Sequence, residues 1–170
     1  GGEEGIKYLP QVDILDPKPM TGKSIKIYVD GGCSGNPGPG AWAYIILYDN
    51  SRIKASCPVP STTNNRMELS AVISALKEAH KHSECKKAVF EVYTDSKYVE
   101  QGITSWIDEW ERNGWLNKKK KPVKNQDLWK SLRELSRPLS ISWRWLQGHA
   151  GHELNEECDR MVQKAIKELK

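Results

Sequence analysis

The 170-residue sequence lacks the features that mark several large protein classes. No apolar run approaches the roughly 20 residues that a membrane-spanning helix needs. The first residues, GGEEGIKYLPQ, contain neither the basic start nor the apolar segment of a secretory signal. The four cysteines include no C-x-x-C pair, so we expect reduced thiols rather than disulfides or a zinc framework. These absences predict a cytoplasmic protein that does not act at a membrane.

The chain does contain enough apolar sequence for one ordinary domain. Hydrophobic residues make up 38% of it and include seven Trp and six Tyr, a composition typical of a folded domain rather than a disordered chain. The formal net charge is +4, which is compatible with a polyanionic partner but does not identify one.

The sequence divides into a leader and one domain. Residues 1–23 are rich in Gly and Pro and show little periodicity, so we predict an extended or partly disordered leader. Residues 24–170 show three strands, a helix, a strand, three short helices, a strand and a final helix. A strand, helix, strand succession implies a parallel crossover. The predicted fold is α/β: a five-stranded mixed sheet, three strands antiparallel and two parallel, flanked by helices.

Two aspartates follow apolar strands, where side chains are expected to fill a core. Asp30 closes the strand IKIYV and Asp95 closes VFEVYT. If these strands are parallel neighbours, the two carboxylates lie close together, because adjacent strands are about 4.8 Å apart. Glu68, in the first turns of the next helix, and Asp159, early in the last helix, add two more carboxylates. Each of the four, taken alone, is equally well explained as an ordinary surface charge.

A pair of neighbouring carboxylates repels unless a cation lies between its members. Hard oxygen ligands select Mg²⁺ or Mn²⁺ over softer metals. Two such ions about 4 Å apart can stabilise both the attacking and the leaving oxygen of a phosphodiester. The sequence therefore predicts that Asp30 and Asp95 belong to a metal site.

Six segments together resemble bacterial-type ribonuclease HI of the ribonuclease H family. They are YVDGGCSGNPGPGAWAYIILY, TTNNRMELSAVISAL, VYTDSKYV, GITSWIDEWERNGW, KKKKPVKNQDLW and QGHAGHELNEECDRM, in family order. The resemblance implies a ribonuclease H fold and an endonuclease that hydrolyses the RNA strand of RNA–DNA hybrids, leaving 3′-hydroxyl and 5′-phosphate ends. It implies two Mg²⁺ ions, with Mn²⁺ as a substitute, and it places their carboxylate ligands, which are the main catalytic residues, on Asp30, Glu68, Asp95 and Asp159.

His149 lies in the sequence GHAGH, for which three interpretations stay open. With His152 and Cys158 nearby it suggests a zinc site, but this site lacks a clear fourth ligand. A loop histidine without a role is the second interpretation. The resemblance favours a third, in which His149 is a catalytic residue on a mobile loop that assists proton transfer or product release.

The resemblance also assigns contacts with the RNA strand, whose 2′-hydroxyls line the minor groove of a hybrid. These contacts fall on Cys33 and Asn36 in a glycine-rich turn, on Asn64 and Asn65 before a helix, and on Lys97. Lys97 stands where a glutamine is common in the bacterial enzymes. Turn and capping propensities alone also explain the Gly-Asn-Pro-Gly turn and the Asn pair, and the two explanations are compatible.

Contacts with the DNA strand are assigned to a different part of the sequence. Trp106 is the candidate for packing on a deoxyribose, whereas Trp110 and Trp115 are expected to pack in the core. A basic protrusion is expected to supply sequence-independent phosphate contacts. Its lysines are Lys118, Lys119, Lys120, Lys121 and Lys124.

A phosphate pocket completes the DNA-strand assignments. Thr63 and Asn125 match this pocket in the family. Ser61 stands where the family often has an arginine, so we expect a weaker pocket here.

Two other functions fit part of the pattern. A non-catalytic hybrid-binding module on the same fold would keep the lysines and tryptophans but lose carboxylates, and this chain has all four. Another nuclease of the same architecture, such as a proofreading exonuclease, a transposase-like nuclease or the nuclease domain of a retroviral polymerase, would share the metal ligands. We expect a monomer that acts on RNA–DNA hybrids.

Overall fold

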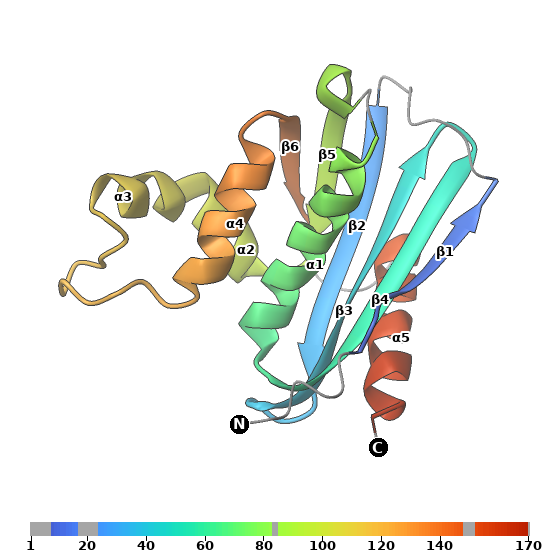
Figure 1. Cartoon of the computed structure of the whole chain (residues 1–170), viewed down its shortest axis with the longest axis horizontal. Coiled ribbons are helices and arrows are strands. Elements are labelled where there is room, and N and C mark those ends of the chain that lie inside the picture. The colour runs from blue at the N-terminus through green and yellow to red at the C-terminus, as the bar shows by residue number, and fades with distance from the viewer. Residues whose placement is uncertain (1–7, 17–23, 83–84, 148–151, 170) are drawn as a thin grey trace.

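A six-stranded mixed sheet forms the centre of the computed structural model, which describes residues 8–16, 24–82, 85–147 and 152–169. The strand order is β1-β4-β3-β2-β5-β6. Figure 1 shows α1 and α4 on one side of this sheet and α5 on the other. The strands are β1 (Gln11–Leu15), β2 (Ser24–Cys33), β3 (Gly38–Tyr48), β4 (Ser51–Thr62), β5 (Val89–Thr94) and β6 (Ser140–Trp145).

The helices follow the predicted order. None of those in the described part of the chain combines the length and the hydropathy that a bilayer crossing needs. The α-helices are α1 (Asn64–His80), α2 (Lys97–Gln101), α3 (Ile107–Arg112), α4 (Gln126–Ser136) and α5 (Glu153–Lys167), with a 3₁₀ turn η2 (Cys85–Lys87) and a π-helical turn η3 (Gly102–Trp106).

The pairing of the strands confirms the predicted mixed sheet and adds one strand to it. β2, β3 and β4 form an antiparallel meander, whereas β5 pairs parallel with both β2 and β6. β1 comes from the segment that we predicted as a leader and pairs antiparallel with β4 at the edge of the sheet. All five residues of β1 are exposed, so no buried face gave this strand a signal in the sequence.

Two apolar layers hold the helices to the sheet. On the α1 side, Ile27 and Val29 of β2 pack in one core with residues of α1 such as Leu76. On the α5 side, Ala43 of β3 packs with Val162 of α5 in a second core. β3 is buried on both faces, which explains why its sequence is a continuous apolar run rather than an alternating one.

A protrusion, residues 102–125, extends away from the sheet between α2 and α4 (Figure 1). It consists of η3, α3 and the lysine loop, which we define as residues 116–124. Leu116 and Pro122 form an isolated β-bridge across the base of this loop. The side-chain oxygen of Asn117 accepts hydrogen bonds from the N–H groups of Lys119 at 2.9 Å and Lys121 at 3.0 Å. These contacts give the loop a defined shape, with its lysines exposed.

Candidate active site

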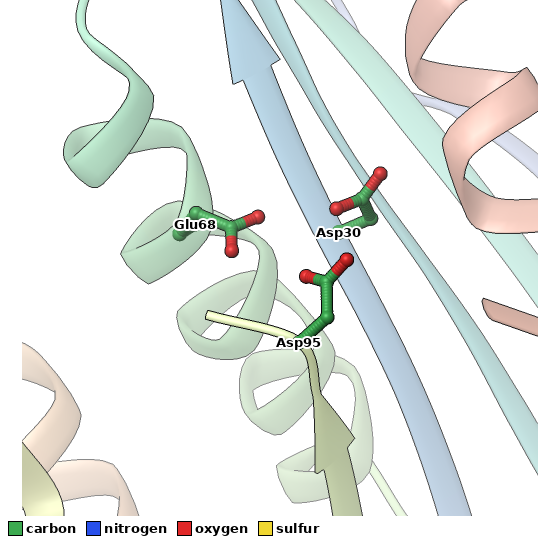
Figure 2. A group of neighbouring side chains, drawn as sticks. All are labelled: Asp30, Glu68 and Asp95. Carbon is green, nitrogen blue, oxygen red and sulfur yellow. The ribbon is translucent and has the colours of Figure 1, made fainter. Parts of the chain in front are cut away.

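Three carboxylates from three different elements meet at one end of the β2 and β5 pair. Asp30 of β2, Glu68 of α1 and Asp95, just after β5, each offer an oxygen, and these oxygens lie within 4.8 Å of one another. Figure 2 shows the three side chains pointing toward a common space. Asp30 is 7% exposed, Glu68 is 9% exposed and Asp95 is half-buried, so the three acids are largely shielded from solvent rather than a set of surface charges.

The register of the sheet explains why the two aspartates meet. β2 and β5 pair in parallel as far as Tyr28 and Tyr93, and each aspartate lies two residues beyond that last pair. Because side chains alternate along a strand, Asp30 lies on the same face as Tyr28. β2 continues to Cys33 by pairing with β3 alone. The prediction that Asp30 closes its strand is therefore wrong, because pairing with β3 carries the strand three residues further.

Glu68 reaches the aspartates because α1 passes unusually close to β2. The N–H of Gly31 donates a hydrogen bond of 2.5 Å to Oε1 of Glu68. A Cβ atom on Gly31 would lie 2.3 Å from the carbonyl carbon of Met67, so only glycine allows this approach. Glu68 is also in the second turn of α1, near the positive end of the helix dipole.

Burial and mutual repulsion favour the protonated forms of two of these acids. Burial, then the negative charges of Asp95 and Asp159, raise the pKa of Asp30 from 3.8 to about 8. Burial, then the charges of Asp30 and Asp95, raise the pKa of Glu68. A divalent cation between the carboxylates would offset both effects, because its positive charge stabilises the ionised forms. The donor set consists only of carboxylate oxygens, which fits hard ions such as Mg²⁺, Mn²⁺ and Ca²⁺.

The other two predicted catalytic residues, Asp159 and His149, are not part of this cluster as the structure describes it. Asp159, on α5, is exposed and is not part of the three-oxygen group. Its charge still contributes to the raised pKa of Asp30, which places it within electrostatic range of the cluster. His149 lies outside the described residues, so its predicted role stays a prediction.

The predicted RNA-strand residues gather where the β2–β3 turn meets α1. The thiol of Cys33 donates to the carbonyl oxygens of Gly38 at 3.2 Å and Thr62 at 3.1 Å, tying the turn to the end of β4. Oδ1 of Asn36 accepts the N–H of Asn64 at 3.1 Å, tying the turn to the first residue of α1. This link between the turn and the helix joins residues 28 positions apart and has no local signal in the sequence.

Asn65 and Lys97 complete the predicted RNA-strand set. Asn65 is exposed in the first turn of α1. Lys97, the exposed first residue of α2, lies two positions after Asp95, and its ammonium nitrogen is 5.5 Å from the ring centre of Trp145. Trp145, which is 38% exposed, was not among the predicted site residues.

Thr63 and Asn125, predicted for the DNA strand, lie on either side of Arg66. Oγ1 of Thr63 accepts the N–H of Arg66 at 3.3 Å, so Thr63 caps α1 rather than the Asn pair. Oδ1 of Asn125 accepts Nη1 of Arg66 at 3.2 Å, and Nδ2 of Asn125 donates to the hydroxyl of Tyr98 at 3.2 Å. Arg66 also forms a two-bond ion pair with Asp127. Sequence reasoning missed Arg66, although it lies inside the TTNNRMEL segment.

Three tryptophans of the protrusion lie near its base. Trp110 and Trp115 are partly buried against the main core, which confirms the expectation of core packing. Trp106 is half-buried, with its ring centre 5.8 Å from that of Trp110. It borders a cavity of about 300 Å³ at the base of the lysine loop. The other residues of this cavity are Glu109, Trp110, Asn113, Leu116, Asn117 and Lys118.

Comparisons with known proteins agree with one another. A family model described as RNase H matches residues 22–167. Ribonuclease H of Bradyrhizobium sp. (strain ORS 278) is 49% identical over 142 residues, which are 84% of this chain and 89% of that protein. Ribonuclease H of Treponema denticola is 48% identical over 158 residues, covering 86% of this chain and 99% of that protein.

Solved structures show the same fold. LC9-RNase H1, described as a type 1 RNase H with the type 2 active-site motif, superposes with a TM-score of 0.77 at 29% identity over 90% of this chain and 76% of that one. LC11-RNase H1, solved in complex with an RNA/DNA hybrid, superposes with a TM-score of 0.67 at 24% identity over 85% of this chain and 97% of that one. With a family model that covers most of its length and relatives that are nearly half identical, this chain belongs to the RNase H family.

Proposed function

We propose that this ribonuclease H hydrolyses the RNA strand of RNA–DNA hybrids at internal phosphodiesters, leaving 3′-hydroxyl and 5′-phosphate ends. The observation that carries the proposal is the largely buried cluster of Asp30, Glu68 and Asp95 in a chain of this family. Such a cluster is costly without a cation, and its oxygens match the ligands that divalent ions prefer. The RNA/DNA hybrid that LC11-RNase H1 binds supports the choice of substrate.

The carboxylates would hold two Mg²⁺ ions, or Mn²⁺ in their place. Asp30, Glu68, Asp95 and Asp159 are the residues that would hold the ions, and Asp30 is the central candidate because the charges of both Asp95 and Asp159 raise its pKa. When bound, the ions would lower the pKa of the attacking water and neutralise charge on the scissile phosphate and the leaving 3′-oxygen. We assign His149 to proton transfer or product release.

The chain's own groups prepare this site before substrate arrives. The N–H of Gly31 fixes one oxygen of Glu68, which leaves the other oxygen free to face the aspartates. The two neighbouring strands fix the separation of Asp30 and Asp95. Little reorganisation of the carboxylates is then needed during the reaction, which is how preorganised charges contribute most to catalysis.

Substrate recognition is assigned to two surfaces. Cys33, Asn36, Asn64, Asn65 and Lys97 would contact the RNA strand through its minor groove, where the 2′-hydroxyls lie. The DNA strand would pack on Trp106, bind through a phosphate at Thr63 and Asn125, and meet the basic protrusion. Of the protrusion, the contacting residues are Lys118, Lys119, Lys120, Lys121 and Lys124.

The proposed assembly is the simplest that the site allows. The described carboxylates all come from one chain, and the proposed substrate is a nucleic acid. We therefore propose a monomer that acts on hybrids in the cytoplasm.

The test compares one labelled sequence as RNA–DNA hybrid, RNA duplex, DNA duplex and single-stranded RNA, with Mg²⁺ and with EDTA. We expect metal-dependent cutting of the RNA strand in the hybrid only, including a hybrid with blocked ends. The variant Asp30→Asn serves as the control for the site. Hybrid binding without cleavage in Mg²⁺ or in Mn²⁺ would instead establish a recognition module. Cleavage that fails when the ends of the hybrid are blocked would establish an exonuclease.

A further inference from the structure

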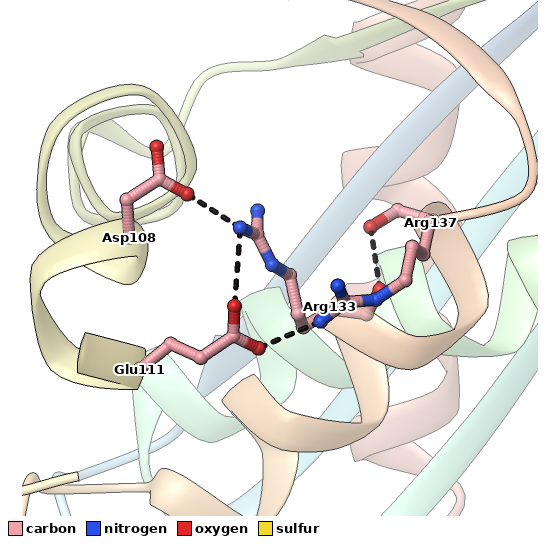
Figure 3. Close-up of polar contacts among 5 residues, drawn as sticks. Asp108, Glu111, Arg133 and Arg137 are labelled. Carbon is pink, nitrogen blue, oxygen red and sulfur yellow. Dashed lines mark hydrogen bonds and ion pairs between the residues drawn. The ribbon is translucent and has the colours of Figure 1, made fainter. Parts of the chain in front are cut away.

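The protrusion is joined to α4 by a compact set of ion pairs. Nη2 of Arg133 lies 2.5 Å from Oδ1 of Asp108 and 3.4 Å from Oε1 of Glu111. Nη2 of Arg137 lies 2.7 Å from Oε2 of the same Glu111. Figure 3 shows Arg133 of α4, and Arg137 directly after the end of α4, reaching to the two acids of α3. We call these four residues the arginine clamp.

The spacing of the clamp makes it a two-point attachment. Asp108 and Glu111 are three residues apart, and Arg133 and Arg137 are four residues apart, so each pair occupies one face of its helix. Glu111 bridges both arginines, while Arg133 bridges both acids. Two attachments on successive helical turns resist rotation of α3 about α4, which a single ion pair would not do.

The protrusion depends on such contacts because its own helix is too short to hold a direction. α3 has six residues and follows a π-helical turn, whereas isolated helices shorter than about 12 residues are marginal in water. On its inner side Trp110 packs edge-on against Trp129 of α4, with ring centres 5.4 Å apart. Ile107, the first residue of α3, is 1% exposed and packs in the main core as well. These apolar contacts hold one side of α3, and the clamp lies on its more exposed side.

We propose that Arg133 and Arg137 are positioning residues that set the angle of the protrusion and thereby the reach of the lysine loop toward the DNA strand. The inference rests on the proposed function, because it needs the lysine loop to contact substrate. The arginines themselves act through α3, and they affect binding of long hybrids rather than the chemical step.

The decisive variant removes the acids rather than the arginines. Asp108→Asn with Glu111→Gln takes two negative charges off the protrusion and leaves Arg133 and Arg137 unpaired. If the only effect were on net charge, KM for a long hybrid would fall, because the two removed carboxylates would no longer repel the phosphate backbone. If the clamp positions the loop, KM rises about three- to tenfold while kcat at saturating substrate stays within about twofold. A lowered or unchanged KM would overturn the proposal.

A charge swap supplies the matched control. Glu111→Arg combined with Arg137→Glu restores one ion pair and keeps the net charge of the protein. We expect each single substitution to raise KM and the swap to recover at least part of the loss. Equal KM values for the swap and the worse single variant would contradict a role for this contact.

Combining the clamp variant with replacements in the lysine loop distinguishes an error in the clamp proposal from an error in the proposed function. In a background with Lys118, Lys119, Lys120 and Lys121 replaced by Gln, the clamp variant should add no further increase in KM, because the loop no longer binds. Independent, multiplicative effects would overturn the clamp and leave the lysine contacts intact. If the lysine replacements alone leave KM unchanged, the lysine contacts and the clamp are both refuted.

Amide hydrogen exchange gives a readout that does not depend on activity. The clamp variant should exchange faster over residues 107–112, with exchange in α1 unchanged, because only the docking of α3 is weakened. Unchanged exchange in α3 would overturn the proposal even if KM rose. Should the double variant fold poorly, Glu111→Gln alone breaks one contact to each arginine and carries the same expectations.

Discussion

The carboxylate cluster and the protrusion are held in place by different kinds of contact. Asp30, Glu68 and Asp95 come from elements whose positions are set by the two apolar cores and by the pairing of β2 with β5. The protrusion rests on a short helix, on a few apolar residues such as Ile107 and Trp110 at the edge of the main core, and on exposed ion pairs. The proposed catalytic carboxylates are thus held by the sheet and its two cores. The lysines proposed to bind the DNA strand lie on a part of the molecule that is attached by fewer buried contacts.

The comparison predicts that changes in the cluster act mainly on kcat and on folding, and that changes in the protrusion act mainly on KM. Four measurements test this division, beginning with the one for which the largest effect is expected.

Asp30→Asn should lower kcat by about 1000-fold or more, because several kcal/mol of charge stabilisation are lost and each 1.4 kcal/mol is tenfold. The measurement is single-turnover cleavage of hybrid in Mg²⁺, with binding of hybrid followed separately. Asp159 is exposed, so we expect Asp159→Asn to lower kcat less than Asp30→Asn does and to leave residual activity. Cleavage by Asp30→Asn at the wild-type rate would show that the cluster is not the catalytic centre.

Gly31→Ala should destabilise the protein by about 1–3 kcal/mol and lower kcat, because the new Cβ meets the backbone of α1 and displaces Glu68. Chemical denaturation and kcat measure the two effects. Gly32→Ala is the matched control, since its Cβ would lie 3.3 Å from the end of the Val162 side chain, which can adjust. Equal losses in both variants would show that the close approach at Gly31 has no special role.

Replacing Lys118, Lys119, Lys120 and Lys121 by Gln should raise KM for long hybrids about tenfold and change kcat little. Each lost phosphate contact should also reduce the slope of log affinity against log salt by about 0.9. Affinity measured across a salt series provides both values. An unaltered salt slope would remove the lysine loop from the substrate interface.

The free energy of unfolding measured in EDTA should decrease as the pH rises from about 4 to about 8. The pKa of Asp30 is about 8 in the folded protein against an ordinary value of 3.8, so the folded state binds more protons in this interval and loses stability as they leave. We expect a change of at least about 1 kcal/mol, since one pKa unit corresponds to about 1.4 kcal/mol. Asp30→Asn should flatten the dependence, and Mg²⁺ should restore stability at pH 8. A curve that rises over this range would contradict the raised pKa.

Much of the fold and of the site followed from local patterns in the sequence. Asp30 and Asp95 stood out because each interrupts the apolar pattern of a strand, and the helix between the strands implied their parallel pairing. The segments of α1 and α5 were visible because their apolar residues recur with helical spacing.

The remaining features depend on contacts between distant segments. β1 gave no signal because it is stabilised by edge pairing with β4 rather than by a buried face. The need for glycine at position 31 arises from α1, 36 residues later in the chain. The role of Arg66 in joining Thr63 to Asn125 likewise appears only when α1 and the start of α4 are side by side.

The end of β2–β5 pairing at Tyr28 and Tyr93 constrains how this part of the chain can vary. Each aspartate lies two residues beyond that last pair, and side chains in a strand alternate in direction from one residue to the next. A single inserted or deleted residue between Tyr93 and Asp95 would shift this carboxylate out of register with Asp30. The length of this short stretch is therefore constrained, and Thr94 within it is itself buried, at 1% exposed.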